Sequence, residues 1–190
     1  VDLNEFANGN ADSAHGLIDM LKDLCSLIRN MTKPVAVAVR GNCLGAGLEV
    51  ALASDFRVCA PDASFGMPEV AVGVPSVIDA ALLMQYIGLG RAKEMLLTGR
   101  PITAELALAW GLVNRVVEPD RVLEEAVALV TTVAGHHPST VRAQKELIED
   151  WLNEPLEESI ENSIPFLVDS FREGIPQKVA REILERRRQT

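Results

Sequence analysis

Two glutamates stand in apolar stretches of the sequence, twenty positions apart. Glu49 falls inside a predicted helix, and Glu69 follows a proline and precedes another apolar, turn-rich segment. A carboxylate in apolar surroundings has its charged form disfavoured, so it can carry a proton near neutral pH. Two such groups facing one pocket can add water across an activated double bond or move a proton along it. Composition alone also allows the plainer interpretation, an ordinary helix glutamate and an ordinary loop glutamate.

The residues just before Glu49 are suited to a negatively charged group. Gly45, Ala46 and Gly47 mark the change from an apolar strand pattern over 34–39 to the helix predicted over 46–54. The first N–H groups of a helix have no acceptor within it, and the helix dipole favours negative charge there. Small residues also let a ligand approach the backbone closely. This stretch can therefore hold both an anion site and an acid or base.

Several segments of the chain resemble the crotonase (enoyl-CoA hydratase/isomerase) superfamily. In order along the chain they are 33–41, 45–58, 65–69, 97–100 and 109–117. The likeness extends from the first residues to about residue 122 and more weakly to the end. It implies an α/β fold of the ClpP/crotonase type, a spiral of β-β-α units. The core would cover 1–122, and a C-terminal helical oligomerisation region would cover 123–190.

The resemblance also implies an acyl-CoA-binding enzyme, first of all an enoyl-CoA hydratase that adds water across the 2,3 double bond. The backbone N–H groups of Ala46 and Val1 would form an oxyanion hole for the thioester oxygen. Glu49 would orient and deprotonate the water, and Glu69 would exchange a proton with the α-carbon. The CoA thioester is the substrate, and no cofactor or metal is expected. The further candidates for substrate or CoA contact are Asp2, Leu3, Gly45, Gly47, Pro68, Pro75 and Ser76.

Three alternatives stay open at this point. They are an enoyl-CoA isomerase or another crotonase-type enzyme that uses one glutamate, and a non-catalytic member that binds CoA. The family's glycine-rich turn after the second glutamate is replaced here by residues 74–80, where a serine, an isoleucine and an aspartate stand. This departure predicts an unusual substrate choice. Asp79 is either a third polar group near the substrate or, more commonly, an aspartate at a helix N-terminus.

The start of the chain resembles a segment that lies well inside family members. Residues 1–6 match the family's A-D-L-x-E-F pattern, which several strands precede in the family. The resemblance therefore implies that the usual N-terminal portion is lacking. At a free terminus, Val1 would carry an ammonium group instead of the amide that the oxyanion hole needs.

Composition restricts the classes of partner. A net charge of −9 argues against nucleic acid as the main partner. The three cysteines lack CxxC spacing and indicate a reducing compartment. Neither a signal peptide nor a membrane-spanning run is visible, so no membrane association is expected. We predict a cytoplasmic protein, with a mitochondrial location left open, that forms a homotrimer or a dimer of trimers and acts on a small-molecule acyl-CoA.

Hydrophobic periodicity predicts the elements that must position the two glutamates. Strands are predicted over 34–39, 56–60 and 113–117. Asp12 or Ser13 is expected to cap the first helix, Thr103 to cap another, and Gly111 to end it. Helices are predicted over 12–31, 46–54, 77–87, 91–97, 103–110, 123–133, 140–152, 156–168 and 176–188.

Overall fold

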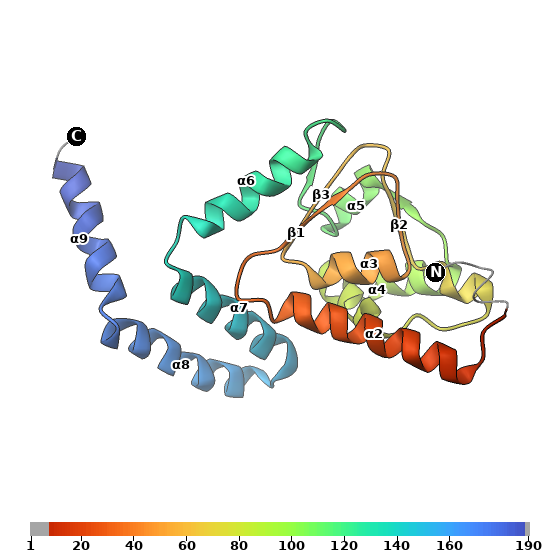
Figure 1. Ribbon diagram of the computed structural model, residues 1–190, viewed down its shortest axis with the longest axis horizontal. Coiled ribbons are helices and arrows are strands. Elements are labelled where there is room, and N and C mark those ends of the chain that lie inside the picture. The colour runs from red at the N-terminus through yellow and green to blue at the C-terminus, as the bar shows by residue number, and fades with distance from the viewer. Residues whose placement is uncertain (1–7, 189–190) are drawn as a thin grey trace. The chain divides into compact units, whose positions relative to one another are not determined.

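The computed structural model describes residues 8–188, and the chain divides into two compact units, Val1–Thr132 and Val133–Thr190 (Figure 1). In the first unit, short strands alternate with helices. Its elements are α2 (Ala11–Arg29), β1 (Ala36–Val39), β2 (Asn42–Leu44), α3 (Ala46–Ala53), β3 (Phe56–Cys59), β4 (Ser64–Gly66), the 3₁₀ helices η1 (Pro68–Val72) and η2 (Ile78–Leu82), α4 (Leu83–Thr98), β5 (Ile102–Thr103), α5 (Ala104–Trp110), β6 (Arg115–Val116) and most of α6 (Val122–Ala134).

The strands form two small sheets. One sheet has the order β1-β3-β6 and is parallel throughout, with Ala36 opposite Phe56. The other has the order β2-β4-β5, with β2 and β4 parallel and β5 antiparallel to β4. Consecutive strands β1 and β2 therefore belong to different sheets, and helix α3 makes the crossover back from β2 to β3. The parallel neighbours β1 and β3 need a crossover between them, and β2 with α3 supplies it.

Helix α3 lies in the main hydrophobic core. Leu48, Ala51 and Leu52 are at most 1% exposed and belong to the same cluster as Phe65 and Met67. An eight-residue helix is too short to be stable alone, so this burial is what holds it. The core thereby fixes the position of every side chain that α3 carries.

Most predicted elements of the first unit are confirmed, with shifts of a few residues at their ends. Thr103 caps α5 by accepting a hydrogen bond from the Leu106 N–H, and Gly111 ends that helix in the left-handed region. The cap of α2 is Asn10, not Asp12; its side chain and Ser13 form a capping box. The two helices predicted on either side of Gly88 and Gly90 are a 3₁₀ turn followed by α4, which bends at Gly88.

The second unit is helical. It contains α7 (Pro138–Asn153), α8 (Leu156–Arg172) and α9 (Ile175–Arg188), each packed on the next. Large apolar side chains on these helices are exposed, among them Trp151, Leu167 and Phe171. Within residues 8–188, no helix has both the length and the apolar character needed to cross a membrane.

Candidate active site

The N-terminus of α3 has a backbone geometry that only glycine adopts easily. Gly45 has φ of 54°, and its N–H donates to the Gly66 carbonyl oxygen at 2.9 Å. This bond continues the pairing of β2 with β4 by one residue. Ala46 is the first residue of the helix, so its N–H has no acceptor within α3. The turn thus presents a backbone donor at the positive end of the helix dipole.

Glu69 lies directly against this turn. A Cβ atom added to Gly45 would collide with Glu69 Oε1, so the carboxylate occupies the space that a side chain at position 45 would fill. Glu69 Oε2 accepts a hydrogen bond from the Ser76 hydroxyl at 2.9 Å. Glu69 is the second residue of η1, which Pro68 begins. The carboxylate is therefore held on one side by Ser76 and on the other by Gly45.

Glu49 reaches the same region from inside α3. It is only 4% exposed, and its N–H donates to the Gly45 carbonyl oxygen at 3.0 Å. Burial, followed by the nearby negative charge of Glu69, raises the pKa of Glu49 to about 7. Asp79 adds to this increase, whereas a hydrogen bond from the Ala80 N–H opposes it. Glu49 can therefore gain or lose a proton near neutral pH.

The described part of the chain brings most of the predicted site residues to the N-terminal end of α3. Gly45, Ala46 and Gly47 form the turn, Glu49 follows within the helix, and Pro68, Glu69 and Ser76 complete the group. The Ser76 hydroxyl, expected to contact substrate or CoA, donates to a carboxylate. Pro75 is exposed. Val1, Asp2 and Leu3 lie outside the described residues.

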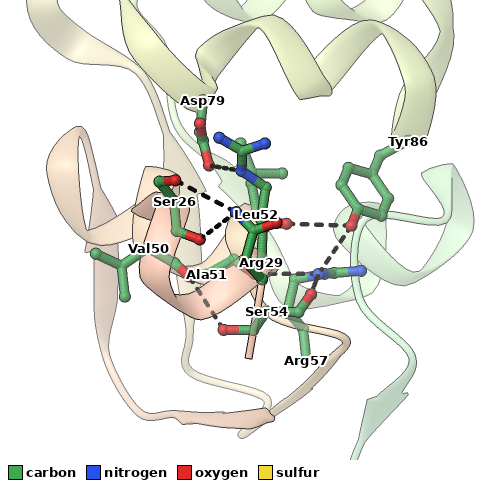
Figure 2. A network of polar contacts seen from close by, with 10 residues as sticks. Ser26, Arg29, Val50, Ala51, Leu52, Ser54, Arg57, Asp79 and Tyr86 are labelled. Carbon is green, nitrogen blue, oxygen red and sulfur yellow. Dashed lines mark hydrogen bonds and ion pairs between the residues drawn. The ribbon is translucent and has the colours of Figure 1, made fainter. Parts of the chain in front are cut away.

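A buried ion pair stands behind Glu49, and its basic member was not found from the sequence. Arg29 Nε of α2 lies 3.2 Å from Asp79 Oδ2, and the Asp79 side chain is 6% exposed (Figure 2). The Cys25 thiol also hydrogen-bonds to Asp79. Of the two explanations left open for Asp79, the helix-terminus one accounts for its place in the first turn of η2 but not for its burial. Arg29 carries no local signal, because its partner is fifty positions away.

The opposite end of α3 is held by a second buried charge, which the sequence analysis also missed. Arg57 is 3% exposed, and its guanidinium donates to the carbonyl oxygens of Leu112, Ala51 and Ser54 at 2.7–3.0 Å. It lies over the Tyr86 ring, 4.2 Å from the centroid, and the Tyr86 hydroxyl donates to the Leu52 carbonyl oxygen (Figure 2). These contacts satisfy the last carbonyls of the helix.

Chemically, the site combines a backbone donor with two carboxylates of different surroundings. A developing oxyanion at the Ala46 N–H would lie next to Glu69 and one helical turn from Glu49. Among residues 8–188, no group of three His, Cys, Asp or Glu side chains is placed to hold a metal ion. The arrangement suits proton transfer next to a carbonyl that is being converted to an enolate.

Comparisons with known proteins identify the family of the chain. The sequence model of the enoyl-CoA hydratase/isomerase family matches residues 1–190. Carnitinyl-CoA dehydratase from Escherichia coli O157:H7 is 41% identical over 159 residues, which make up 83% of this chain and 60% of that protein. The chain thus spans about 60% of the length of this relative.

Solved structures give the same result for the fold. Enoyl-CoA hydratase subunit I from Geobacillus kaustophilus HTA426 matches with a TM-score of 0.88 and 30% identity, over 98% of this chain and 72% of that one. DspI from Pseudomonas aeruginosa matches with a TM-score of 0.87 and 30% identity, over 95% of this chain and 71% of that one. The predicted crotonase fold is confirmed.

Proposed function

Since the chain belongs to the enoyl-CoA hydratase/isomerase family of the crotonase superfamily, we propose that it adds water across the 2,3 double bond of an enoyl-CoA thioester. The observation that carries this proposal is the meeting of Glu49 and Glu69 at the N-terminus of α3. Hydration needs one group to take a proton from water and another to deliver one to carbon. Two carboxylates beside a backbone oxyanion donor supply both functions.

In the proposed reaction the thioester oxygen accepts a hydrogen bond from the Ala46 N–H. Glu49 takes a proton from water as the hydroxide adds to the β-carbon, and electrons move through the double bond to the thioester oxygen. Glu69 then delivers a proton to the α-carbon, which restores the carbonyl. Because the pKa of Glu49 is about 7, this residue is near half-ionised at neutral pH and can serve the reverse elimination as well. The name of the Escherichia coli relative, a dehydratase, is consistent with catalysis in that direction.

The assembly and location of the protein are part of the proposal. The exposed apolar side chains of α7–α9 support a homotrimer or a dimer of trimers, in which such surfaces would be covered. Bacterial relatives support a cytoplasmic location. Analytical ultracentrifugation of the purified protein gives the oligomeric state directly.

The activity is tested by following the loss of conjugated thioester absorbance when the protein is mixed with crotonyl-CoA. Glu69→Gln and Glu49→Gln each remove one carboxylate but keep the shape of the side chain. We expect each to lower kcat by about 10²- to 10⁴-fold, the usual contribution of a general acid or base. Glu118→Gln, which removes an exposed carboxylate, serves as the control and keeps full activity.

Two outcomes would overturn hydration. If the wild-type protein binds CoA but leaves the double bond of enoyl-CoA substrates intact, it is not a hydratase. If Glu49→Gln continues to convert a 3-enoyl-CoA to the 2-enoyl isomer at the wild-type rate, the protein is an isomerase that depends on Glu69 alone.

A further inference from the structure

The turn 77–80 contacts Glu49, and its Asp79 forms an ion pair with Arg29 of helix α2. We propose that Asp79, anchored by Arg29, is a positioning residue for Glu49: it fixes the turn that places the Ala80 N–H against the Glu49 carboxylate and controls the proton that this carboxylate carries. This inference rests on the proposed function, in which Glu49 transfers that proton. It assigns a role to a residue that touches neither water nor substrate in the proposed reaction.

The first support is the way in which Asp79 is anchored. Arg29 Nε is 3.2 Å from Asp79 Oδ2, and the two side chains are 25% and 6% exposed. The Cys25 thiol of the same helix also hydrogen-bonds to Asp79. Figure 2 shows Asp79 reaching from η2 toward Arg29. Residues on α2 thus hold a carboxylate that belongs to the turn after Glu69.

The second support is the backbone of this turn. Ile78 has φ of 49°, the only positive φ of a residue other than glycine within 8–188. A β-branched side chain is strained in the left-handed region, so neighbouring contacts must hold it there. The ion pair of Asp79 follows directly, and the Ala80 N–H donates to the Val77 carbonyl oxygen. The same N–H lowers the pKa of Glu49. The strained residue Ile78 is therefore followed directly by the anchored Asp79 and lies within the turn that the Val77–Ala80 hydrogen bond closes.

The third support is the electrostatic environment of Glu49. The groups that face it are Glu69 from η1, Asp79 and the Ala80 N–H from η2, and the Cys25 thiol from α2, with Arg29 beyond Asp79. Like charges destabilise the ionised form of Glu49, so Asp79 raises its pKa and the Ala80 N–H lowers it. Two neighbouring residues of one short turn thus act in opposite directions on the pKa of Glu49.

The test is Asp79→Asn, which keeps the side-chain shape and removes the charge. We expect Glu49 to ionise at lower pH, so the acid limb of the kcat/KM profile for hydration moves down by about half to one pH unit. The rate of the variant relative to wild type is then several-fold higher at pH 6 than at pH 8. Asp120→Asn removes the same charge from an exposed turn and leaves the limb in place. Because asparagine keeps the shape of the side chain, the turn and its Ala80 N–H stay in place and only the charge is lost. An unshifted limb in folded Asp79→Asn therefore overturns the proposal.

A second variant covers the case in which the loss of the Asp79 charge beside Arg29 prevents folding. Arg29→Gln combined with Asp79→Asn replaces the ion pair with two neutral amides that can hydrogen-bond to each other. Its acid limb is expected to move in the same direction. An unchanged limb in this double variant counts against Asp79 as well.

Carbon-13 NMR of labelled glutamate side chains separates this inference from the proposed hydratase activity. The titration of the Glu49 carboxyl, assigned by its loss in Glu49→Gln, is followed in wild type and in Asp79→Asn. A lower midpoint in the variant supports the inference even if the wild-type protein hydrates nothing, in which case only the proposed function fails. An equal midpoint overturns the inference whatever the activity.

Discussion

A charged side chain is buried at each end of α3, and the groups that surround the two side chains differ. At the C-terminal end, the Arg57 guanidinium meets three carbonyl oxygens and the face of Tyr86. At the N-terminal end, Glu49 is equally buried but faces Glu69 and Asp79, with the Ala80 N–H as a favourable contact. The first charge has matched partners, and the second has like charges for neighbours.

The two ends of α3 therefore have different roles: the C-terminal end contributes to stability, and the N-terminal end holds the group that can exchange a proton. A buried guanidinium that donates to several carbonyl oxygens joins the segments to which those carbonyls belong. A buried carboxylate among other carboxylates is destabilised in its ionised form, so it keeps an exchangeable proton near pH 7. The contacts of Arg57 join the C-terminal end of α3 to Leu112 and so help to hold the helix that carries Glu49.

Among the variants that test this comparison, Arg57→Met is expected to have the largest effect, a loss of stability. The substitution keeps much of the side-chain volume but leaves the carbonyl oxygens of Leu112, Ala51 and Ser54 without their donor. We expect the free energy of unfolding to fall by about 3–5 kcal/mol, because several buried acceptors lose their partner at once. Urea denaturation followed by circular dichroism measures this change.

The exposed Arg100 provides the matched control, since Arg100→Met removes the same charge and is expected to change stability by less than about 0.5 kcal/mol. If Arg57→Met were as stable as this control, the contacts at the C-terminal end of α3 would contribute nothing to stability. The contrast between the two ends would then fail.

Glu49→Gln is expected to have an intermediate effect, of the opposite sign. The folded-state pKa of Glu49 is about 7, above its ordinary value of 4.5, so the folded protein binds this proton more tightly than the unfolded chain does. Stability is therefore greatest below about pH 4.5 and declines as the pH rises to about 7. Across that window the loss amounts to about 2–3 kcal/mol. Glutamine carries no charge at any pH and avoids this loss.

We therefore expect Glu49→Gln to be more stable than wild type by about 3 kcal/mol at pH 8 and nearly equally stable near pH 4.5. Thermal or urea unfolding over this pH range gives the difference, and Glu118→Gln shows no such pH dependence. A constant difference between Glu49→Gln and wild type at all pH values would mean that Glu49 is not the group that titrates in this window.

Local sequence signals were sufficient to predict where α3 begins and which two glutamates lie near its N-terminus. The break between the strand at 34–39 and the helix at 46–54 correctly predicted where α3 begins, because small residues and apolar periodicity act over a few positions. The Thr103 cap and the Gly111 terminus were predicted for the same reason. The candidates Glu49 and Glu69 were selected by apolar context and resemblance, and both lie at the end of α3.

Contacts between distant segments could not be predicted in this way. Arg29 pairs with a residue fifty positions later, and Arg57 binds a carbonyl fifty-five positions away, so neither shows any periodic or spacing signal. The turn at 74–80 was noted for its missing glycines, for its effect on substrate choice and for Asp79, but not for its backbone conformation. The structure shows that Ile78 adopts a backbone conformation that glycine normally supplies, which requires the tertiary contacts around it.

The smallest effect is expected from Ser76→Ala. This variant tests, at the N-terminal end of α3, which of its two neighbours holds the Glu69 carboxylate, Ser76 or Gly45. The Ser76 hydroxyl donates to Glu69 Oε2 at 2.9 Å, whereas Oε1 faces Gly45. Loss of this bond leaves the carboxylate in place but free to rotate away from the turn. We expect kcat for enoyl-CoA hydration to fall about 5- to 10-fold, equivalent to about 1 kcal/mol, with KM nearly unchanged.

Ser76→Thr keeps the hydroxyl and is expected to restore most of the lost rate, which a purely steric effect would not do. Steady-state kinetics on crotonyl-CoA distinguishes these cases, because an altered substrate contact would raise KM and leave kcat intact. Such a rise would assign Ser76 to the substrate, as the sequence resemblance implied, and would contradict its role in orienting Glu69. An unchanged kcat together with an unchanged KM would show that Gly45 and the rest of the turn hold Glu69 without help from Ser76.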